Sequence, residues 1–126
     1  MDEPRQALLA SYVDAFERYD MDALTALLKS DAHWNMPPYD LWLRTHKDIA
    51  AWCLGPGVGC RGSRLVPTHA NGSAAFGQYK PDPDGGHEPW ALQVLELSGG
   101  RIAEFTFFLD TETLFPLFGL PPRLDP

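Results

Sequence analysis

The chain is poor in cysteine, in basic residues and in long apolar runs, and each shortage excludes a class of protein. Two cysteines, Cys53 and Cys60, are too few for a disulfide framework and form no Cys-x-x-Cys pair, which favours a cytoplasmic setting with free thiols. Only 10 Lys and Arg stand against 17 Asp and Glu, a net charge of −7, so direct nucleic-acid binding is not expected. No apolar run approaches the ~18–20 residues of a bilayer crossing, and no basic-then-apolar leader opens the sequence. Membrane and secreted classes are therefore disfavoured.

The content that remains is typical of one globular domain. The chain has 126 residues, of which 44% are hydrophobic and 21% are charged. Such a length is enough for one core and a pocket. We expect a single domain over 1–126, with a helical pair over 1–30, a sheet with one inserted helix over 31–110 and a proline-rich tail over 111–126.

The first half of the chain carries helical periodicity. Apolar residues recur at steps of three and four between Leu8 and Tyr19, which predicts one long amphipathic helix. Asp20 is placed to cap a second, shorter helix that packs close to the first. Thr45 opens a third helix with the form of a capping box, and this helix ends at Gly55.

The rest of the chain is β-like. A short strand over 32–36 is halted by Pro37-Pro38, and an aromatic-rich loop follows over 39–44. Asn71-Gly72 is a two-residue hairpin signal within a run of antiparallel strands. These strands are expected over 63–70, 74–80, 88–97 and 101–109. The order of elements predicts an α+β fold, a curved antiparallel sheet with about three helices packed on it.

Neither a cofactor nor a metal is expected. The string from Gly57 to Gly62 matches G-x-G-x-x-G, but it follows a helix and precedes a strand, the reverse of what a dinucleotide site needs. The four histidines show no H-x-x-x-H or H-E-x-x-H spacing.

Aromatic residues are the strongest local signal. Four Trp would overfill so small a core, and Trp prefers a site where its N–H finds a partner. A core filled by these rings is the simpler interpretation and stays open. An apolar cavity with a few polar groups is the usual form of a small-molecule site, which favours a small apolar ligand. The candidate lining residues are Trp34, Met36, Tyr39, Trp42, Trp52, Phe76, Gln78, Gln93, Phe105 and Phe107.

Acid–base chemistry would need an ionisable group on the inward face of the sheet. Alternation on the last strand predicts an apolar inward face made of Ala103, Phe105, Phe107 and Leu109. Glu104 and Glu96 are then solvated.

The weak catalytic candidates are therefore Asp40, at the mouth of the pocket, with His33 or Tyr39. Of the strand neighbours His33 and Trp34, one is expected to face the pocket.

Five segments carry a resemblance that covers almost the whole chain. They are 12–21 (YVDAFERYDM), 36–42 (MPPYDLW), 75–79 (AFGQY), 89–94 (PWALQV) and 114–122 (LFPLFGLPP). With the order of elements, they resemble the SnoaL-like branch of the nuclear transport factor 2-like cone fold. More narrowly, they are similar to the C-terminal domain of actinobacterial extracytoplasmic-function RNA polymerase sigma factors.

The resemblance implies a non-catalytic pocket domain that modulates transcription initiation by ligand sensing or by docking on the sigma core. The partners are then the sigma core or RNA polymerase, if the chain is part of a longer one. Catalytic relatives carry an acid near the positions of Phe105 and Phe107, which this chain lacks. The alternative is a small polyketide-cyclase-like, isomerase-like or hydrolase-like enzyme acting on an apolar ring substrate.

A third hypothesis is a homodimer. Trp90, Leu92 and Val94 alternate with Gln93 and Leu95, so one of the two sets is a candidate interface on the face of the sheet.

Overall fold

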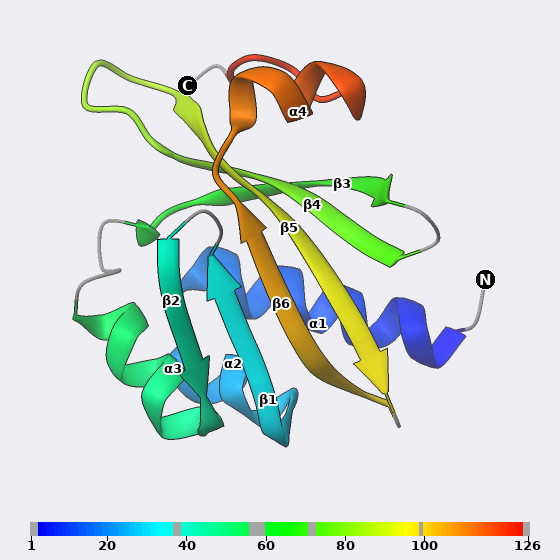
Figure 1. Cartoon of the computed structure of the whole chain (residues 1–126). Helices are drawn as coiled ribbons and strands as arrows, with labels where there is room; N and C mark the ends of the chain where they lie inside the picture. The colour runs from blue at the N-terminus through cyan, green and yellow to red at the C-terminus, as the bar shows by residue number, and fades with distance from the viewer. Residues whose placement is uncertain (1–2, 37–38, 56–59, 71–72, 99, 125–126) are drawn as a thin grey trace.

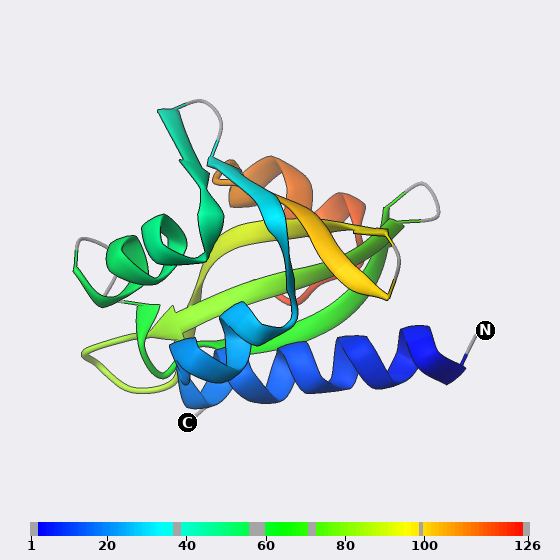
Figure 2. The same cartoon turned by 90° about the horizontal axis from the view of Figure 1, so that it is seen from below.

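A curved six-stranded sheet with helices on both faces forms the molecule (Figures 1 and 2). The computed structural model describes residues 3–36, 39–55, 60–70, 73–98 and 100–124. The helices are α1 (Glu3–Arg18), α2 (Met21–Ala26), α3 (Thr45–Leu54) and α4 (Thr111–Leu117). The strands are β1 (Leu28–Met36), β2 (Tyr39–Arg44), β3 (Arg64–Ala70), β4 (Ser73–Pro81), β5 (His87–Ser98) and β6 (Arg101–Phe108).

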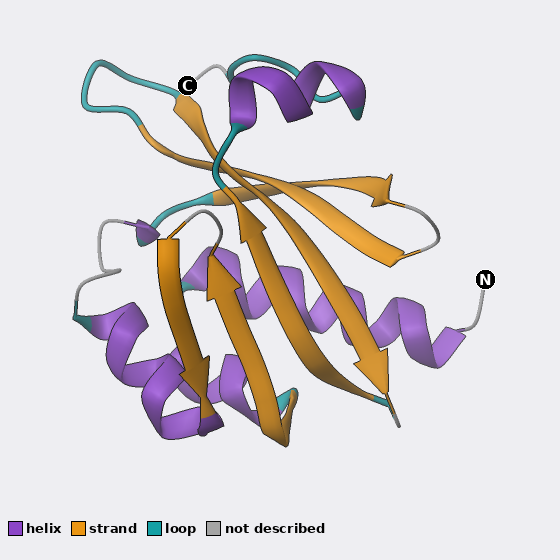
Figure 3. Ribbon diagram, in the orientation of Figure 1, coloured by secondary structure: helices purple, strands orange, loops and turns teal. Residues whose placement is uncertain are grey.

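The two faces of the sheet are covered differently. Helices α1, α2 and α3 lie on one side, here called the inner face, while α4 lies on the other, the outer face (Figures 2 and 3). The strand order is β2-β1-β6-β5-β4-β3, and every pair is antiparallel except β1 with β6. The α+β class is confirmed, and the sheet is mixed rather than antiparallel throughout.

The three expected helices are confirmed, and packing and capping explain the first two. Helix α1 buries Tyr12, Ala15 and Phe16 at the predicted spacing. The Asp20 side chain caps α2 by accepting a hydrogen bond from the backbone N–H of Ala23, at 3.2 Å. Helix α2 ends at residue 26 and β1 begins at residue 28, so the helical pair stops earlier than the expected boundary at residue 30.

The four strands of the second half are also confirmed. Strands β3 and β4 pair with Ala70 opposite Ser73, which leaves the Asn-Gly pair at 71–72, outside the described residues, as the connection. The loop expected over 39–44 is wrong, because these residues form strand β2, which pairs with β1 at the edge of the sheet. Strand β1 ends at Met36 as expected, and the proline pair expected to halt it lies outside the described residues.

Two irregularities in pairing change which side chains face inward. The register shifts between Glu96 and Leu97, opposite the segment from Ile102 to Glu104. The extra residue there is Ala103, which is half-buried, whereas Ile102 is fully buried. The inward position expected for Ala103 is therefore wrong, because a bulge shifts the alternation by one residue.

The second shift lies between Gln78 and Tyr79, which pair with Ala91 and Pro89. Trp90 is the extra residue, and its ring approaches Phe107 of the inner face at 6.4 Å between centroids. The expectation that Trp90 shares a face with Leu92 and Val94 is therefore wrong.

The core has two parts. The larger fills the space between the inner face and helices α1 to α3. The smaller lies under α4 on the outer face and consists of Tyr79, Leu92, Phe115 and Leu120. No described helix has the length and apolar character to cross a membrane.

Candidate functional site

An aromatic cluster lies at the centre of the inner face. Trp34 on β1 stacks on Phe107 of β6 with ring centroids 4.4 Å apart and planes 3° from parallel. Phe105 and Trp52 approach Trp34 at 5.3 Å and 5.9 Å. The cluster therefore joins strands β1 and β6 to helix α3.

The polar atom of Trp34 is the exception within this cluster. The side chain is 2% exposed, and its Nε1 has no hydrogen-bond acceptor among the residues that the structure describes. Buried N–H groups are nearly always paired, because an unpaired donor loses its hydration without compensation. The indole N–H of Trp34 thus offers one free donor inside an apolar surrounding.

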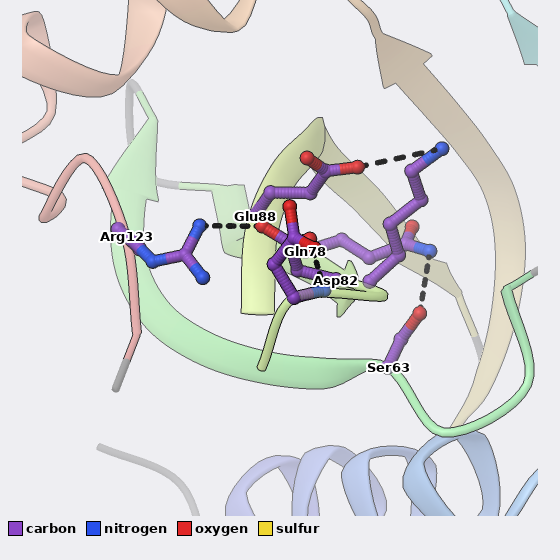
Figure 4. A network of polar contacts seen from close by, with 7 residues as sticks. Ser63, Gln78, Asp82, Glu88 and Arg123 are labelled. Atoms are coloured by element: carbon purple, nitrogen blue, oxygen red, sulfur yellow. Dashed lines mark hydrogen bonds and ion pairs between the residues drawn. The ribbon is translucent and has the colours of Figure 1, made fainter. Parts of the chain in front are cut away.

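Four buried polar side chains are joined in a chain that we call the amide relay, made of Tyr12, Gln93, Gln78 and Ser63. The Tyr12 hydroxyl donates to Gln93 Oε1, and Gln93 Nε2 donates to Gln78 Oε1 at 2.7 Å. Gln78 Nε2 donates to Ser63 Oγ at 3.3 Å, a contact drawn in Figure 4. Ser63 Oγ in turn donates to the Cys60 carbonyl oxygen at 2.6 Å.

The relay is uncharged and almost fully buried. Each glutamine uses a donor and an acceptor within it, which fixes the orientation of both amides. The relay connects α1 to strands β5 and β4 and to the start of β3. It holds no group that gains or loses a proton near neutral pH.

A charged cluster at the end of the sheet fastens the C-terminal segment (Figure 4). Arg123 Nη1 donates to Asp82 Oδ2 at 2.7 Å, and Arg123 also donates to the Gly85 carbonyl. The backbone N–H of Asp84 and then Arg123 hold the pKa of Asp82 below its usual value. Arg123 is exposed and Asp82 is half-buried, and the cluster lies apart from the aromatic interior.

The structure brings most predicted lining residues together on the inner face. Those with buried or half-buried side chains there are Trp34, Met36, Trp52, Phe76, Gln78, Gln93, Phe105 and Phe107. Tyr39, Asp40 and Trp42 lie in β2, but their side chains are outside the described part of the chain. His33 lies on the opposite face from Trp34 and is half-exposed.

Sequence reasoning missed Tyr12 and Ser63 as members of the site. Tyr12 was placed on the buried face of its helix, but nothing along the chain shows that its hydroxyl reaches Gln93, 81 positions away. Ser63 precedes a strand and carries no signal beyond its type. Partners so far apart in sequence are visible only once the fold is known.

The one interior thiol with a described environment, that of Cys60, is held in its neutral form. Burial raises the pKa of the Cys60 thiol, which counts against a reactive thiolate. Among the described residues, no three His, Cys, Asp or Glu side chains converge in a way that would hold a metal ion.

Two grooves flank α4 on the outer face. The first, which we call the sheet groove, has a volume of about 400 Å³ and is lined by Ser73, Leu92, Val94, Glu96, Phe108, Leu114 and Phe118. The second, the proline groove, has a volume of about 430 Å³ and is lined by Pro89, Thr111, Glu112, Phe115, Pro116, Leu120 and Pro122.

A curved sheet covered by helices around an aromatic interior defines an α+β domain of the cone type. The SnoaL-like domain family matches residues 9–105, and the chain belongs to this family.

The comparisons with individual proteins extend this assignment. The chain is 41% identical, over 94% of its length, to the ECF RNA polymerase sigma factor SigG of Mycobacterium tuberculosis. It spans 32% of that relative's length, so about two thirds of the relative lies outside the match.

Solved structures share the fold. A nuclear transport factor 2-like protein of unknown function from Burkholderia pseudomallei has a TM-score of 0.67 at 22% identity, covering 94% of this chain and 98% of that one. An M. tuberculosis LEH-like epoxide hydrolase has a TM-score of 0.63 at 17% identity, covering 90% and 87%.

Proposed function

We propose that this SnoaL-like domain is a non-catalytic regulatory module of a sigma factor that binds a small apolar molecule in its interior. The near-full-length match to a sigma factor supports the regulatory context. The unpaired Trp34 Nε1 is the single observation that carries the ligand-binding part.

The chemistry of the ligand follows from the surroundings of Trp34. Phe107 and Phe105 pack their rings against Trp34, so a molecule that enters beside Trp34 meets aromatic surface, which favours a planar hydrocarbon body. The free N–H favours one acceptor on that body, such as a carbonyl or ether oxygen. We therefore expect a flat, mostly apolar molecule with one hydrogen-bond acceptor directed at Trp34.

Binding rather than catalysis is favoured by the polar groups on the inner face. The amide relay and the Trp34 indole are neutral groups, and none of them serves as a general base near neutral pH. Phe105 and Phe107 occupy the inward positions of β6.

The binding test uses a matched pair of ligands, 1-tetralone and tetralin, which share a ring body and differ in one carbonyl. In calorimetric titrations, we expect 1-tetralone to bind about tenfold more tightly, the value of one hydrogen bond. Trp34→Phe removes the donor and keeps an aromatic ring, so it should abolish the difference between the two ligands.

Trp52→Phe serves as the control, because Trp52 contacts the same cluster. It should leave the preference for the ketone intact. Equal binding of both ligands by the wild-type chain, or failure to bind either, would reject the interior site.

The regulatory part is tested in promoter-dependent transcription. This chain replaces the matched region of M. tuberculosis SigG, and RNA synthesis is compared with and without 1-tetralone. We expect a ligand-dependent change in the hybrid and none in its Trp34→Phe form. If the hybrid sigma factor and SigG lacking the matched region give the same amount of RNA, a regulatory role is contradicted.

The alternative function is a small hydrolase-like or cyclase-like enzyme that uses Asp40. The shared fold of the epoxide hydrolase favours it, and β2 places the Asp40 backbone next to the end of β1, where Tyr39 pairs with Met36. Asp40→Asn would then abolish turnover of an epoxide such as limonene oxide without unfolding the chain. Absence of wild-type turnover would reject this alternative.

A further inference from the structure

The half of the outer face that α4 leaves uncovered combines apolar surface with unpaired negative charge. Helix α4 covers the part of β4 and β5 beneath Phe115 and Leu120. Beyond it, Phe108 is 36% exposed and Val94 is half-buried. Together with Leu114 these side chains line the sheet groove.

Two carboxylates lie directly opposite each other at the rim of this groove. Glu96 of β5 pairs in register with Glu104 of β6. Like charges facing each other across antiparallel strands destabilise a sheet. Their nearest partners are neutral, since Glu96 accepts from Ser73 Oγ at 2.8 Å and Glu104 from Asn35 Nδ2 at 3.4 Å.

No ion pair joins either carboxylate to a cation among the described residues. His33 lies beside Glu104 in the register of β1 and β6, as the ionisable neighbour on the third strand. The repulsion between Glu96 and Glu104 is therefore not relieved by a described Lys or Arg.

A second copy of this chain is a poor occupant of the groove. In a two-fold dimer formed through this groove, the Glu96–Glu104 pair of one chain would lie near the same pair of the other chain. Each chain also carries a net charge of −7, so the two copies repel each other. A partner with apolar side chains flanked by Lys or Arg complements both the groove and its rim. An amphipathic helix presents such residues together at i, i+3 and i+4.

We propose that the sheet groove docks a basic amphipathic helix, whose apolar face packs on Val94 and Phe108 and whose Lys or Arg bridges Glu96 and Glu104. The inference rests on the proposed function, because it assigns the helix to the part of the sigma factor outside this domain. That part is about two thirds of the relative's length, since this chain spans 32%.

The test titrates this chain with the segment of M. tuberculosis SigG outside the matched region, by calorimetry at low and high salt. We expect binding that weakens as salt rises, because the rim pairs are exposed and screened. The double variant Glu96→Gln/Glu104→Gln should bind about tenfold more weakly and lose most of the salt dependence.

The double variant should also unfold at the same temperature as the wild type or higher, because it removes a repulsion. A merely structural role for the two glutamates would lower that temperature. Phe108→Ser tests the apolar half separately and should weaken binding at every salt concentration. Glu112→Gln in the proline groove is the matched control and should bind like the wild type.

Three outcomes overturn the docking site. They are full binding by both the rim variant and Phe108→Ser, no binding of the SigG segment by the wild type, and a dimer of this chain that Phe108→Ser disrupts. The tetralone titration is independent of all three, so failure of the docking site and failure of the interior site are distinguishable.

Discussion

Some polar side chains of the interior are hydrogen-bonded to one another, whereas the Trp34 indole N–H has no described acceptor, and the two cases differ in what they contribute. Members of the amide relay satisfy one another, so their contribution is to stability and to the geometry of the sheet. Trp34 Nε1 has no such partner, so its contribution is available to a ligand.

The first prediction concerns the relay. Gln93→Leu removes the acceptor of the Tyr12 hydroxyl and the donor to Gln78 Oε1, and it leaves the buried Gln78 Oε1 without its donor. We expect the free energy of unfolding to fall by about 1–3 kcal/mol for each atom left unsatisfied. Urea denaturation followed by circular dichroism measures the change.

Gln6→Leu, at an exposed position of α1, controls for the change of side chain and should leave stability nearly unchanged. An equal loss in both variants would show that the relay contributes nothing specific.

The second prediction follows from the buried phenol of Tyr79, whose hydroxyl donates to the Pro121 carbonyl at 2.6 Å. Burial raises the pKa of Tyr79 from its usual value near 10 to about 12. The folded chain therefore holds this proton more tightly than the unfolded chain does. The stabilisation is complete below pH 10 and is lost as the pH rises toward 12.

Absorbance of the phenolate at 295 nm measures this titration. One tyrosine of the wild type should ionise near pH 12, and Tyr79→Phe should remove that step. Ionisation of Tyr79 near pH 10 in the folded chain would contradict its burial.

At the scale of helices and strands, the sequence predicts correctly those features that depend on residues close together in the chain. The periodicity of α1 and the cap at Asp20 act within one or two turns, and both are confirmed. Strand β2 was missed because aromatic residues after two prolines suit a loop and an edge strand equally. The bulges at Trp90 and Ala103 depend on pairing between strands, which no single segment encodes.

In the candidate site, too, some residues could be identified from their own segment and others only from the fold. Gln78 and Gln93 were identified as polar groups within expected strands, and they do lie in the interior. Their partners Tyr12 and Ser63 come from other elements and had no signal of their own. Whether the Trp34 N–H finds an acceptor depends on how the interior packs, so no single stretch of the sequence could have shown that it lacks one.

The third prediction concerns the contact between β4 and the C-terminal segment. A Cβ on Gly77 would lie 2.8 Å from Leu120 Cδ1 and 3.3 Å from Tyr79 Cε1. Gly77→Ala should therefore lower the free energy of unfolding by about 1–3 kcal/mol through overpacking. Thermal unfolding measures it.

Leu120→Ala removes the clashing side chain and supplies the internal control. The double variant should lose less stability than the sum of the two single variants. Strict additivity would show that Gly77 and Leu120 do not interact.

At the scale of the whole molecule, the two proposed sites share strands on opposite faces of one sheet. Phe107 lies in the interior cluster, and the next residue, Phe108, lines the sheet groove. In the two proposals, therefore, the same strands contact the interior ligand on one side and the docked helix on the other.

The fourth prediction follows from this shared sheet. If 1-tetralone changes the affinity for the SigG segment, the segment must change the affinity for 1-tetralone by the same factor. We expect a change of about fivefold or more in both directions, measured by calorimetry in the two orders of addition. In Trp34→Phe the affinity for the segment should no longer respond to the ligand.

The most direct test of the central claim observes the Trp34 indole itself. In nitrogen–proton correlation spectra, the chain should show four indole N–H signals, and the one lost in Trp34→Phe identifies Trp34. We expect 1-tetralone to shift this signal downfield as the N–H gains an acceptor, and tetralin to leave it without that shift. A Trp34 signal that responds identically to both compounds, or to neither, would contradict the interior ligand site.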